Sequence, residues 1–422
     1  MIGRIQTALE KCGISLWRIN ETVEETAELF FVRQQLDTRR IKDVRKYEVT
    51  VFRDVEDKRG FTSVNLIASM EDAQIEEELK SAYYAAQFAA NPTYELTDPV
   101  KAPLVEKAGE LAEAPLARSA GKMARALFAP DTREDAFINS AELFVRRKRV
   151  HILSSEGTDV SYTDANVNGE FVVQCREPED VEIHNIYSYN ELETKALSEK
   201  VEEALDFVRD RAKAQRTLKS GTYDLVLSGN AVNEVLSYYQ SRSAAHAVYA
   251  KYSTWQRGEN VQGEDVSGER LNITLCATVP YSDEGIPMED LPLLKEGALQ
   301  AYHGANRLSR YLGIKPTGGY QKLACANGTV PFAELKKGPC LWAVTFSDFQ
   351  MNAMSGHFGG EIRLAYLIDG DTVTPVTGGS VNGSILEAQK NLTFSAERYV
   401  TARYEGPYAV RLTGVSIAGA GE

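Results

Sequence analysis

Residues 355–379 read SGHFGGEIRLAYLIDGDTVTPVTGG. Apolar and aromatic side chains dominate 362–368, and a second run at 372–376 is rich in Val and Thr, which are residue types enriched in β-strands. The intervening Asp-Gly-Asp at 369–371 supplies the residues that tight turns favour. This stretch therefore predicts a β-hairpin in the C-terminal half of the chain.

The rest of the C-terminal half continues this β-rich pattern around one helix. Residues 223–228 have the composition of a strand, and helical spacing follows from Asn230 to about Tyr249. Further strand-like runs occupy 271–279 and 340–346. We expect a β-rich domain in which a helix follows the first strand.

The N-terminal half mixes helices and strands. Its predicted elements are helices at 2–11, 71–90 and 190–215 and strands at 28–36 and 47–55. Lys-Ser-Gly at 219–221 interrupts the pattern, and 422 residues exceed the size at which a single hydrophobic core keeps growing. We therefore predict an α+β protein with an N-terminal mixed α/β domain, residues 1–220, and a C-terminal β-rich domain, residues 221–422.

Charge narrows the range of partners. The chain has 47 Lys and Arg against 60 Asp and Glu, and its net charge of -13 repels phosphate backbones and anionic lipid. One basic run, 146–149, lies inside an apolar, strand-like segment and is interpreted as a solvated strand end. We expect neither nucleic acid nor a membrane as a partner.

Hydropathy and cysteine usage predict the compartment. No apolar stretch approaches the roughly 20 residues that cross a bilayer, and the N-terminal residues lack the apolar core of a secretory signal. The five cysteines are scattered without a CxxC pair, which fits reduced thiols better than a disulfide framework. We expect a cytoplasmic protein.

Several segments occur in an order that resembles one known family. They are GTYDLVLS at 221–228, DEGIP at 283–287, LKEGALQAY at 294–302, SGHFGGE at 355–361 and YLIDGDTVTP at 366–375. This series resembles the TldD/PmbA family, whose members are also called modulators of DNA gyrase. The resemblance spans most of the chain and is strongest after Gly221.

The resemblance implies a two-domain α+β protein that acts in peptide processing, often as a pair of related subunits. In such a pair the TldD-type subunit carries a zinc peptidase site, with HExxxH on the helix after the opening strand and a further Cys ligand near the C-terminus. The PmbA- or TldE-type subunit looks similar but lacks the metal ligands.

The residues that this zinc site needs are missing from the corresponding positions. Catalytic zinc requires clustered imidazoles or thiolates and a nearby carboxylate base. The five histidines are at least 33 residues apart, and no HExxH or HExxxH occurs. The motif would fall near Ser237–Arg242, which holds no usual ligand, and 397–406 contains no Cys. We predict no catalytic residue, no metal ligand and no cofactor.

His357 and Glu361 are the candidates for a different site. A histidine titrates near neutrality, so the two could meet a metal or act as an acid/base pair. Their place at the entry to a strand favours a structural hydrogen bond instead. Cys325 and Cys340 would need a nearby basic His to act as nucleophiles, and we interpret both as core residues.

We therefore expect a non-catalytic, metal-free subunit similar to PmbA/TldE, inactive as a peptidase on its own. Its expected partners are a zinc-bearing TldD-type peptidase in a heterodimer, or a second copy in a homodimer, together with a peptide substrate. Two alternatives stay open. One is an active peptidase or hydrolase with an unrecognised site around His357 and Glu361, and the other is a regulatory binding protein of the gyrase-modulator type.

Overall fold

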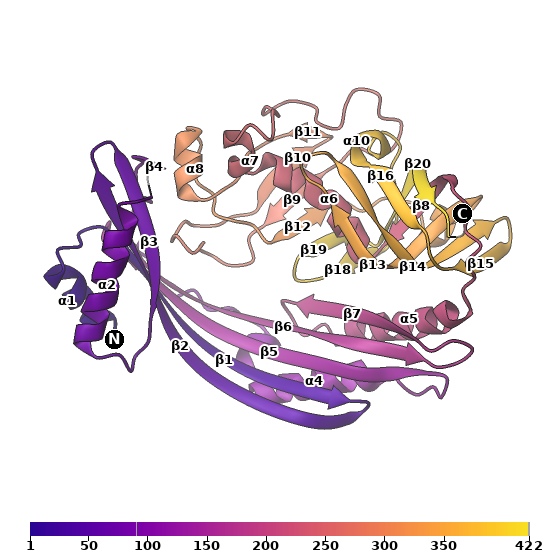
Figure 1. Ribbon diagram of the computed structural model, residues 1–422, viewed down its shortest axis with the longest axis horizontal. Coiled ribbons are helices and arrows are strands. Elements are labelled where there is room, and N and C mark those ends of the chain that lie inside the picture. Colours follow the sequence, from indigo (N-terminus) through magenta and orange to yellow (C-terminus); the bar gives the residue numbers. More distant parts are fainter. Residues whose placement is uncertain (90, 421–422) are drawn as a thin grey trace.

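Long strands with alternating side chains build the sheet of the N-terminal half. The computed structural model describes residues 1–89 and 91–420 and places seven strands in the antiparallel order β4-β3-β2-β1-β5-β6-β7 (Figure 1). The strands are β1 (Trp17–Val32), β2 (Gln35–Val55), β3 (Lys58–Leu66), β4 (Asn91–Pro92), β5 (Ala136–Ser154), β6 (Asp159–Cys175) and β7 (Val181–Tyr189).

Five helices accompany this sheet. They are α1 (Ile2–Lys11), α2 (Asp72–Ala86), α3 (Glu110–Glu113), α4 (Leu116–Phe128) and α5 (Thr194–Lys213). In α5, Leu197, Val201 and Leu205 recur at helical spacing and are fully buried with apolar residues of β5 and β6. The helices α4 and α5 therefore cover one face of the sheet, while α1 and α2 pack at its far end.

The strands of the C-terminal half form a closed sheet and an open one. The strand β13 pairs with both β8 and β14, so that the path β13-β8-β20-β16-β14 returns to its start. The strands of this sheet are β8 (Gly221–Ser228), β13 (Cys340–Met351), β14 (His357–Asp369), β15 (Thr372–Val376), β16 (Ser380–Ser384), β17 (Thr393–Phe394) and β20 (Ala409–Ala418). The hairpin predicted at 362–376 is confirmed as β14 and β15.

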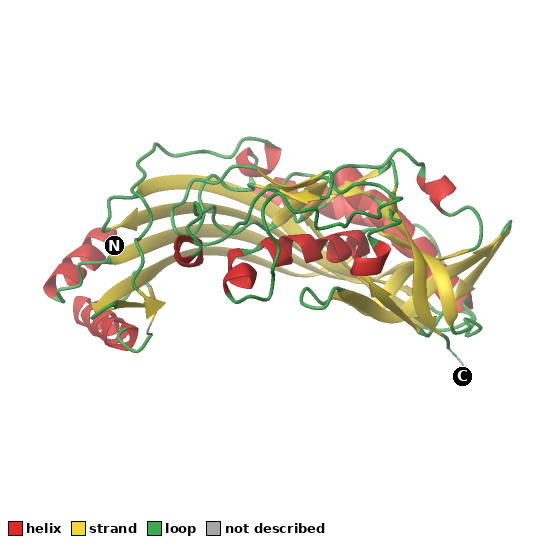
Figure 2. Ribbon diagram, turned by 90° about the horizontal axis from the view of Figure 1, so that it is seen from above, coloured by secondary structure: helices red, strands yellow, loops and turns green. Residues whose placement is uncertain are grey.

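The open sheet has six strands in the order β11-β10-β9-β12-β19-β18. They are β9 (Ile273–Cys276), β10 (Leu291–Lys295), β11 (Ala298–Leu299), β12 (Lys322–Cys325), β18 (Arg398–Val400) and β19 (Tyr404–Pro407). The helices are α6 (Asn230–Ser243), α7 (Ala245–Tyr249), α8 (Asn306–Tyr311), α9 (Phe332–Leu335) and α10 (Ile385–Ala388). Figure 2 shows the strands of both halves from above. The predicted β-rich C-terminal region, with a helix directly after its first strand, is confirmed.

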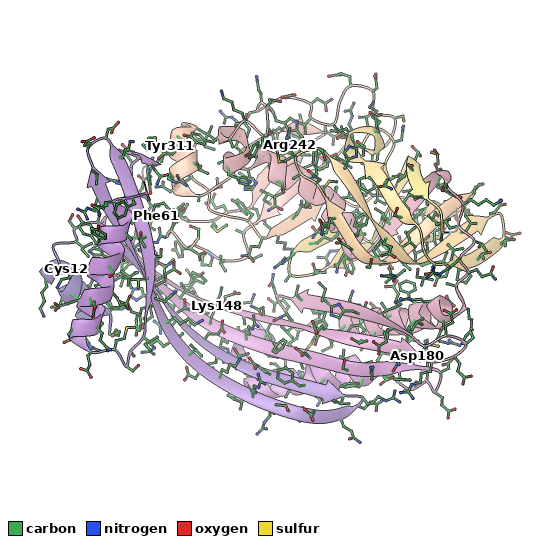
Figure 3. The ribbon with its side chains drawn as sticks, in the orientation of Figure 1. Cys12, Phe61, Lys148, Asp180, Arg242 and Tyr311 are labelled. Carbon is green, nitrogen blue, oxygen red and sulfur yellow. The ribbon has the colours of Figure 1, made fainter. Side chains whose placement is uncertain are left out.

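The two halves meet at both ends of the molecule. At one end, the Asn306 side chain in α8 donates to the Glu95 carbonyl at 2.8 Å, and Arg310 pairs with Asp98 at 3.0 Å. Phe61 and Tyr311 mark this end in Figure 3. The other end joins α5 to β14 and β15. No helix among residues 1–89 and 91–420 is both long and apolar enough to cross a bilayer.

Two predicted elements differ from the structure. The strand predicted at 28–36 is wrong, because β1 ends at Val32 and β2 starts at Gln35 after a turn in which Arg33 has φ 57°. That turn contains neither Gly nor Pro, so no residue of it marks the end of a strand. The helix predicted from Asn230 to about Tyr249 is divided, because Ala244 has an extended backbone.

The predicted division at 220/221 stays a prediction. The strand β8 begins at Gly221, which agrees with that position. The helix predicted at 71–90 is confirmed as α2, although α2 ends at Ala86. Residue 90 and residues 421–422 lie outside the described part of the chain.

Candidate functional site

A cavity of about 890 Å³ lies between the seven-stranded sheet and the C-terminal half, and we call it the central cavity. One wall is formed by β5, β6 and β7, and the other by the start of α6, the loop after β9 and residues 401–403. Lys148 in β5, labelled in Figure 3, lies on the cavity side of the sheet. Each half of the chain therefore contributes one wall.

The sheet wall is polar because side chains alternate along each strand. Leu143 and Val145 in β5, and Ala165 and Val167 in β6, are buried in the core beneath α4 and α5. The even-numbered residues point the other way, into the central cavity. They are Phe144, Arg146, Lys148, Tyr162, Asp164, Asn166, Asn168, Glu170, Ile186 and Ser188.

The basic run 146–149 lies in the middle of β5, so its interpretation as a solvated strand end is wrong. Arg146 and Lys148 face the central cavity, and the Lys148 ammonium lies 3.5 Å from the Asp164 carboxylate. Arg147 lies on the other face and donates to the Ala114 carbonyl at 2.6 Å. A strand can carry cations in its middle here because the cavity supplies space and counter-charge.

The first turns of α6 provide the facing wall. Asn230, Asn233 and Glu234 lie at positions i, i+3 and i+4, and therefore share one side of the helix. The Tyr399 hydroxyl donates to the Asn230 side-chain oxygen at 3.1 Å, and Glu234 accepts from the Met351 backbone N–H at 3.0 Å. These bonds fix the polar side of α6 toward the central cavity.

Asn168 presents an unused acceptor in the sheet wall. Its Oδ1 is buried and accepts no hydrogen bond from any residue in 1–89 or 91–420. Leaving a buried acceptor without a donor costs about 1–3 kcal/mol. This oxygen would reach a ligand N–H in the cavity only if the side chain turned toward it.

Asparagine is the commonest polar residue type in the lining. The members are Asn166, Asn168, Asn190, Asn230 and Asn233. Each side-chain amide has both donors and an acceptor, as a peptide unit has. The cavity chemistry therefore suits the main chain of a polypeptide.

The positions that correspond to HExxxH do not fit zinc. Ser237 in α6 donates to the Glu234 carbonyl at 2.6 Å, and Tyr239 donates to Gln389 at 2.8 Å. The Arg242 guanidinium is bonded to the Tyr252 carbonyl. Within the described ranges there is no group of three or more His, Cys, Asp or Glu arranged to hold a metal ion.

The structure does not bring His357 and Glu361 together. Both are exposed on β14, and their Cα atoms are separated by about 13 Å of extended strand. Glu361 accepts from the Ser347 hydroxyl at 2.9 Å and pairs with Arg363 at 3.3 Å. Neither candidate lines the central cavity.

The two cysteines interpreted as core residues are buried, as predicted. Burial raises the pKa of the Cys325 thiol to about 12. Burial also raises the pKa of Cys340, whose thiol donates to the Lys336 carbonyl at 3.5 Å. Both thiols are therefore protonated near neutral pH, and neither is an activated nucleophile.

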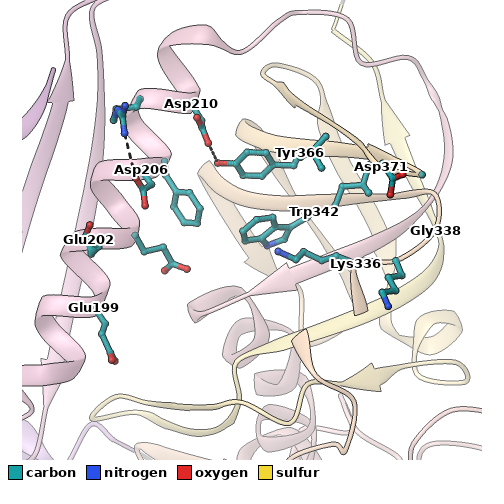
Figure 4. Close-up of a pocket in the computed structure, with 16 residues that line it drawn as sticks. Glu199, Glu202, Asp206, Asp210, Lys336, Gly338, Trp342, Tyr366 and Asp371 are labelled. Carbon is teal, nitrogen blue, oxygen red and sulfur yellow. Dashed lines mark hydrogen bonds and ion pairs between the residues drawn. The ribbon is translucent and has the colours of Figure 1, made fainter. Parts of the chain in front are cut away.

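A second cavity, of about 990 Å³, lies between α5 and the β13–β15 strands (Figure 4). Trp342 stacks on Tyr366 with ring centroids 4.9 Å apart, and the Tyr366 hydroxyl donates to Asp210 at 2.6 Å. The Lys336 ammonium lies 4.1 Å from the centre of the Trp342 ring. These contacts join α5 to the C-terminal half.

A third cavity, of about 780 Å³, adjoins the other two. It shares Glu203 and Phe207 with the second cavity, and Asn230 and Glu234 with the central cavity. The cavities therefore follow one another along the join between the halves.

The buried His303 contacts α6 and should make the stability of the fold pH-dependent. It is 6% exposed, its Nε2 lies 2.9 Å from the Gln240 carbonyl, and burial lowers its pKa from 6.5. As the pH falls below 6.5, the unfolded chain binds a proton at this position that the folded chain does not. Stability is therefore lost on acidification. We expect His303→Gln to flatten the pH dependence of the unfolding free energy between pH 7.5 and 5.5.

The matched control is His246→Gln, because His246 is exposed on the neighbouring α7. Urea unfolding at a series of pH values measures both variants. An unchanged slope in His303→Gln would contradict this prediction.

Sequence reasoning missed the polar sheet wall. The signal was present in part, since polar residues occupy the even positions from 164 to 170, between Ala165, Val167, Gly169 and Phe171. The polar side chains of β6 indicate a cavity only when a second wall lies opposite them. That wall begins at Asn230, 60 positions after Glu170.

Comparisons with known proteins agree with this architecture. Residues 220–419 match the family model described as the PmbA/TldA metallopeptidase C-terminal domain. A protein described as a metalloprotease TldD homologue from Haemophilus influenzae is 26% identical over 161 residues. That match covers 31% of this chain and 33% of the relative, so it spans about a third of the relative's length.

Solved structures share the fold over almost the whole chain. TldE from Thermococcus kodakarensis superposes with a TM-score of 0.80 at 16% identity, covering 99% of this chain and 100% of its own. A candidate modulator of a DNA gyrase from Thermotoga maritima has a TM-score of 0.78 at 16% identity, with 99% of both chains covered. A second candidate gyrase modulator, from Bacteroides thetaiotaomicron, has a TM-score of 0.78 at 17% identity and covers 99% of this chain and 98% of its own. At these identities the similarity shows the fold alone. The C-terminal half of this chain, residues 220–419, is therefore similar to the C-terminal domain of the PmbA/TldA metallopeptidases.

Proposed function

We propose that this protein is a non-catalytic subunit that binds an extended peptide in the central cavity and pairs with a zinc-bearing, TldD-type peptidase. The observation that carries the proposal is a large polar cavity beside a helix whose HExxxH-equivalent positions hold Ser237 and Arg242. Such a subunit contributes binding surface, while the partner contributes the metal and its activated water. We place the pair in the cytoplasm.

The wall residues support a peptide as the ligand. Asn168 and Asn233 both line the cavity, and a side-chain amide has the donors and the acceptor that match a main-chain carbonyl and N–H. Main-chain bonds of this kind hold extended peptides without strict dependence on side chains. The ligand class is therefore an unstructured polypeptide segment.

The hydrogen-bonded positions of α6 argue against metal-dependent hydrolysis by this chain. Ser237 already donates to a helix carbonyl, and Arg242 is a cation that repels a metal ion. The alternative hydrolase built on His357 and Glu361 lacks a shared site for the two side chains. We therefore assign no catalytic role to this subunit.

Mixing experiments test the proposal. The purified chain should cleave no unstructured peptide and should bind less than stoichiometric zinc after dialysis. Cleavage should appear when it is mixed with an HExxxH-containing TldD-type relative, and should disappear when that relative is first treated with a chelator. Cleavage of fluorogenic peptides and metal analysis measure these outcomes. Robust, chelator-sensitive cleavage by the isolated chain would contradict the proposal.

A further inference from the structure

Two of the three cations in the lining of the central cavity have no charged partner. The Lys148 ammonium pairs with the Asp164 carboxylate at 3.5 Å. The guanidinium groups of Arg146 and Arg403 form neither an ion pair nor a hydrogen bond anywhere in the described part of the chain. A guanidinium offers five N–H donors and stays charged at any physiological pH. Both groups are therefore available to a ligand that enters the cavity.

The sheet around Arg146 offers it no free counter-charge. In the strand register Arg146 lies opposite Thr26 of β1 and Asn166 of β6, and both of these residues are uncharged. On β6, Asp164 is shared by two lysines, at 3.5 and 3.6 Å. On β1, the Glu28 carboxylate lies 2.6 Å from a lysine of β2. Because Arg146 is half-buried, a ligand carboxylate would replace hydration that the cavity restricts.

Arg403 has a fixed backbone and a free side chain. Its carbonyl accepts from the Leu323 N–H at 3.0 Å, and its own N–H donates to the Thr401 side-chain oxygen at 3.2 Å. The neighbouring Ala402 N–H donates to the Ser188 carbonyl of β7 at 2.7 Å. The loop between β18 and β19 is therefore held against the end of β7, and it presents an exposed guanidinium to the central cavity.

The two arginines border a strip of amide side chains. Asn166 lies opposite Arg146, and Asn168, two residues further along β6, lies opposite Ser188 of β7. The path from β5 across β6 and β7 to the loop of Arg403 covers three strand spacings, or roughly 15 Å. An extended chain covers that distance in four or five residues. One peptide segment can therefore reach both guanidinium groups.

We propose that Arg146 and Arg403 make the central cavity selective for peptides that carry a carboxylate, either on an Asp or Glu side chain or at a free C-terminus. A guanidinium matches a carboxylate with two parallel N–H···O bonds, which a neutral side chain cannot form. This inference rests on the proposed function, because it requires a peptide in the central cavity. It adds a charge preference to a ligand class that main-chain bonds alone leave open.

The other charges of the cavity limit the ligand to a few carboxylates. Glu170, Glu234 and Asp283 also line the central cavity, and the net charge of the chain is -13. This field repels a polyanion such as a nucleic acid. A single carboxylate beside a guanidinium gains at short range, whereas its repulsion by more distant acids is weakened by water and salt. The ligand is therefore a mostly neutral segment with one or two acidic groups.

Binding of matched peptides tests the selectivity. Three labelled decapeptides of Ser, Gly and Ala differ only in charge: one has a central Gln and both ends blocked, one has Glu in place of Gln, and one keeps Gln but has a free C-terminal carboxylate. Fluorescence anisotropy at low salt should show about tenfold tighter binding for at least one carboxylate peptide than for the neutral one. The difference should shrink as salt is added. The peptide that gains affinity identifies the side chain or the C-terminus as the source of the carboxylate.

Arginine substitutions test which groups cause the preference. Arg146→Gln and Arg403→Gln should each reduce the preference for the carboxylate peptide, and the double variant should abolish it, while the affinity for the neutral peptide stays the same. Arg149→Gln is the matched control, because Arg149 is an exposed residue of the same strand that does not line the central cavity. It should keep the full preference. Circular dichroism and urea unfolding check that all variants are folded.

The outcomes separate this inference from the proposed function. Equal affinity for neutral and carboxylate peptides, or a preference that survives in the double variant, would overturn the inference and leave peptide binding in place. No binding of any of the three peptides would overturn the peptide-binding role itself. Tighter binding of a short oligonucleotide than of every peptide would identify phosphate as the ligand group and overturn both.

Discussion

Asn168→Trp should abolish peptide binding while leaving the fold intact. The side chain projects from β6 into the central cavity, where a larger group finds space but occupies the path of an extended ligand. The substitution also removes the unpaired Oδ1 acceptor. We expect at least a tenfold loss of affinity, which corresponds to about 1.4 kcal/mol. Fluorescence anisotropy with labelled, unstructured decapeptides measures this loss.

The matched control is Asn65→Trp, which makes the same substitution at an exposed position of β3 that does not line the central cavity. It should bind peptide like the wild type. Both variants should unfold at similar urea concentrations. Unchanged affinity in a folded Asn168→Trp protein would show that peptide does not occupy the central cavity. Cleavage by the mixed pair, measured with the same variant, reports separately on the zinc partnership.

Gly169→Ala should strongly destabilise the sheet wall next to that position. A Cβ atom at residue 169 would lie 2.0 Å from the Glu142 carbonyl oxygen and 2.4 Å from the Tyr187 hydroxyl oxygen. The Tyr187 hydroxyl also donates to that carbonyl at 3.0 Å, so the residues around the glycine are fixed. We expect a loss of about 3 kcal/mol, at the upper end of the usual cost of overpacking. Urea unfolding followed by circular dichroism measures it.

Two further variants test whether the steric clash at residue 169 causes the loss of stability, and which neighbour contributes to it. Gly221→Ala makes the same change in β8, where the nearest atom to the new Cβ would be Tyr223 at 3.5 Å, an ordinary contact distance. It should leave stability nearly unchanged. Gly169→Ala combined with Tyr187→Phe should recover only part of the loss, because the Glu142 carbonyl belongs to the backbone. Full stability in the single variant would mean that β5 and β6 can separate at this point at little cost.

Local patterns predicted the elements with clear boundaries. The hairpin at 362–376 was predictable because Asp-Gly-Asp interrupts two β-rich runs, and α5 was predictable because apolar residues recur at helical spacing. The strand predicted at 28–36 failed because the turn at Arg33 has no Gly or Pro to mark it. Short-range chemistry determines such features only where the turn residues have strong conformational preferences.

The candidate site was less predictable than the fold. Missing zinc ligands could be read from the chain, since a ligand absent from the sequence is absent from any fold of it. The central cavity could not be predicted from the sequence. Asn168 lies on a strand and Asn233 on a helix, 65 positions apart, and both line the cavity only after the halves pack together. His357 and Glu361 show the converse, since they are close in sequence but separated by an extended backbone.

The sequence by itself determined the motifs that resemble the TldD/PmbA family and the lack of HExxxH. Each is a property of residue order and needs no long-range contact. Only the tertiary structure decided which face of β5 and β6 meets α6, and that β3 ends before it covers residues 35–46 of β2. Both outcomes depend on burying apolar surface between segments distant in the chain, which no local preference specifies.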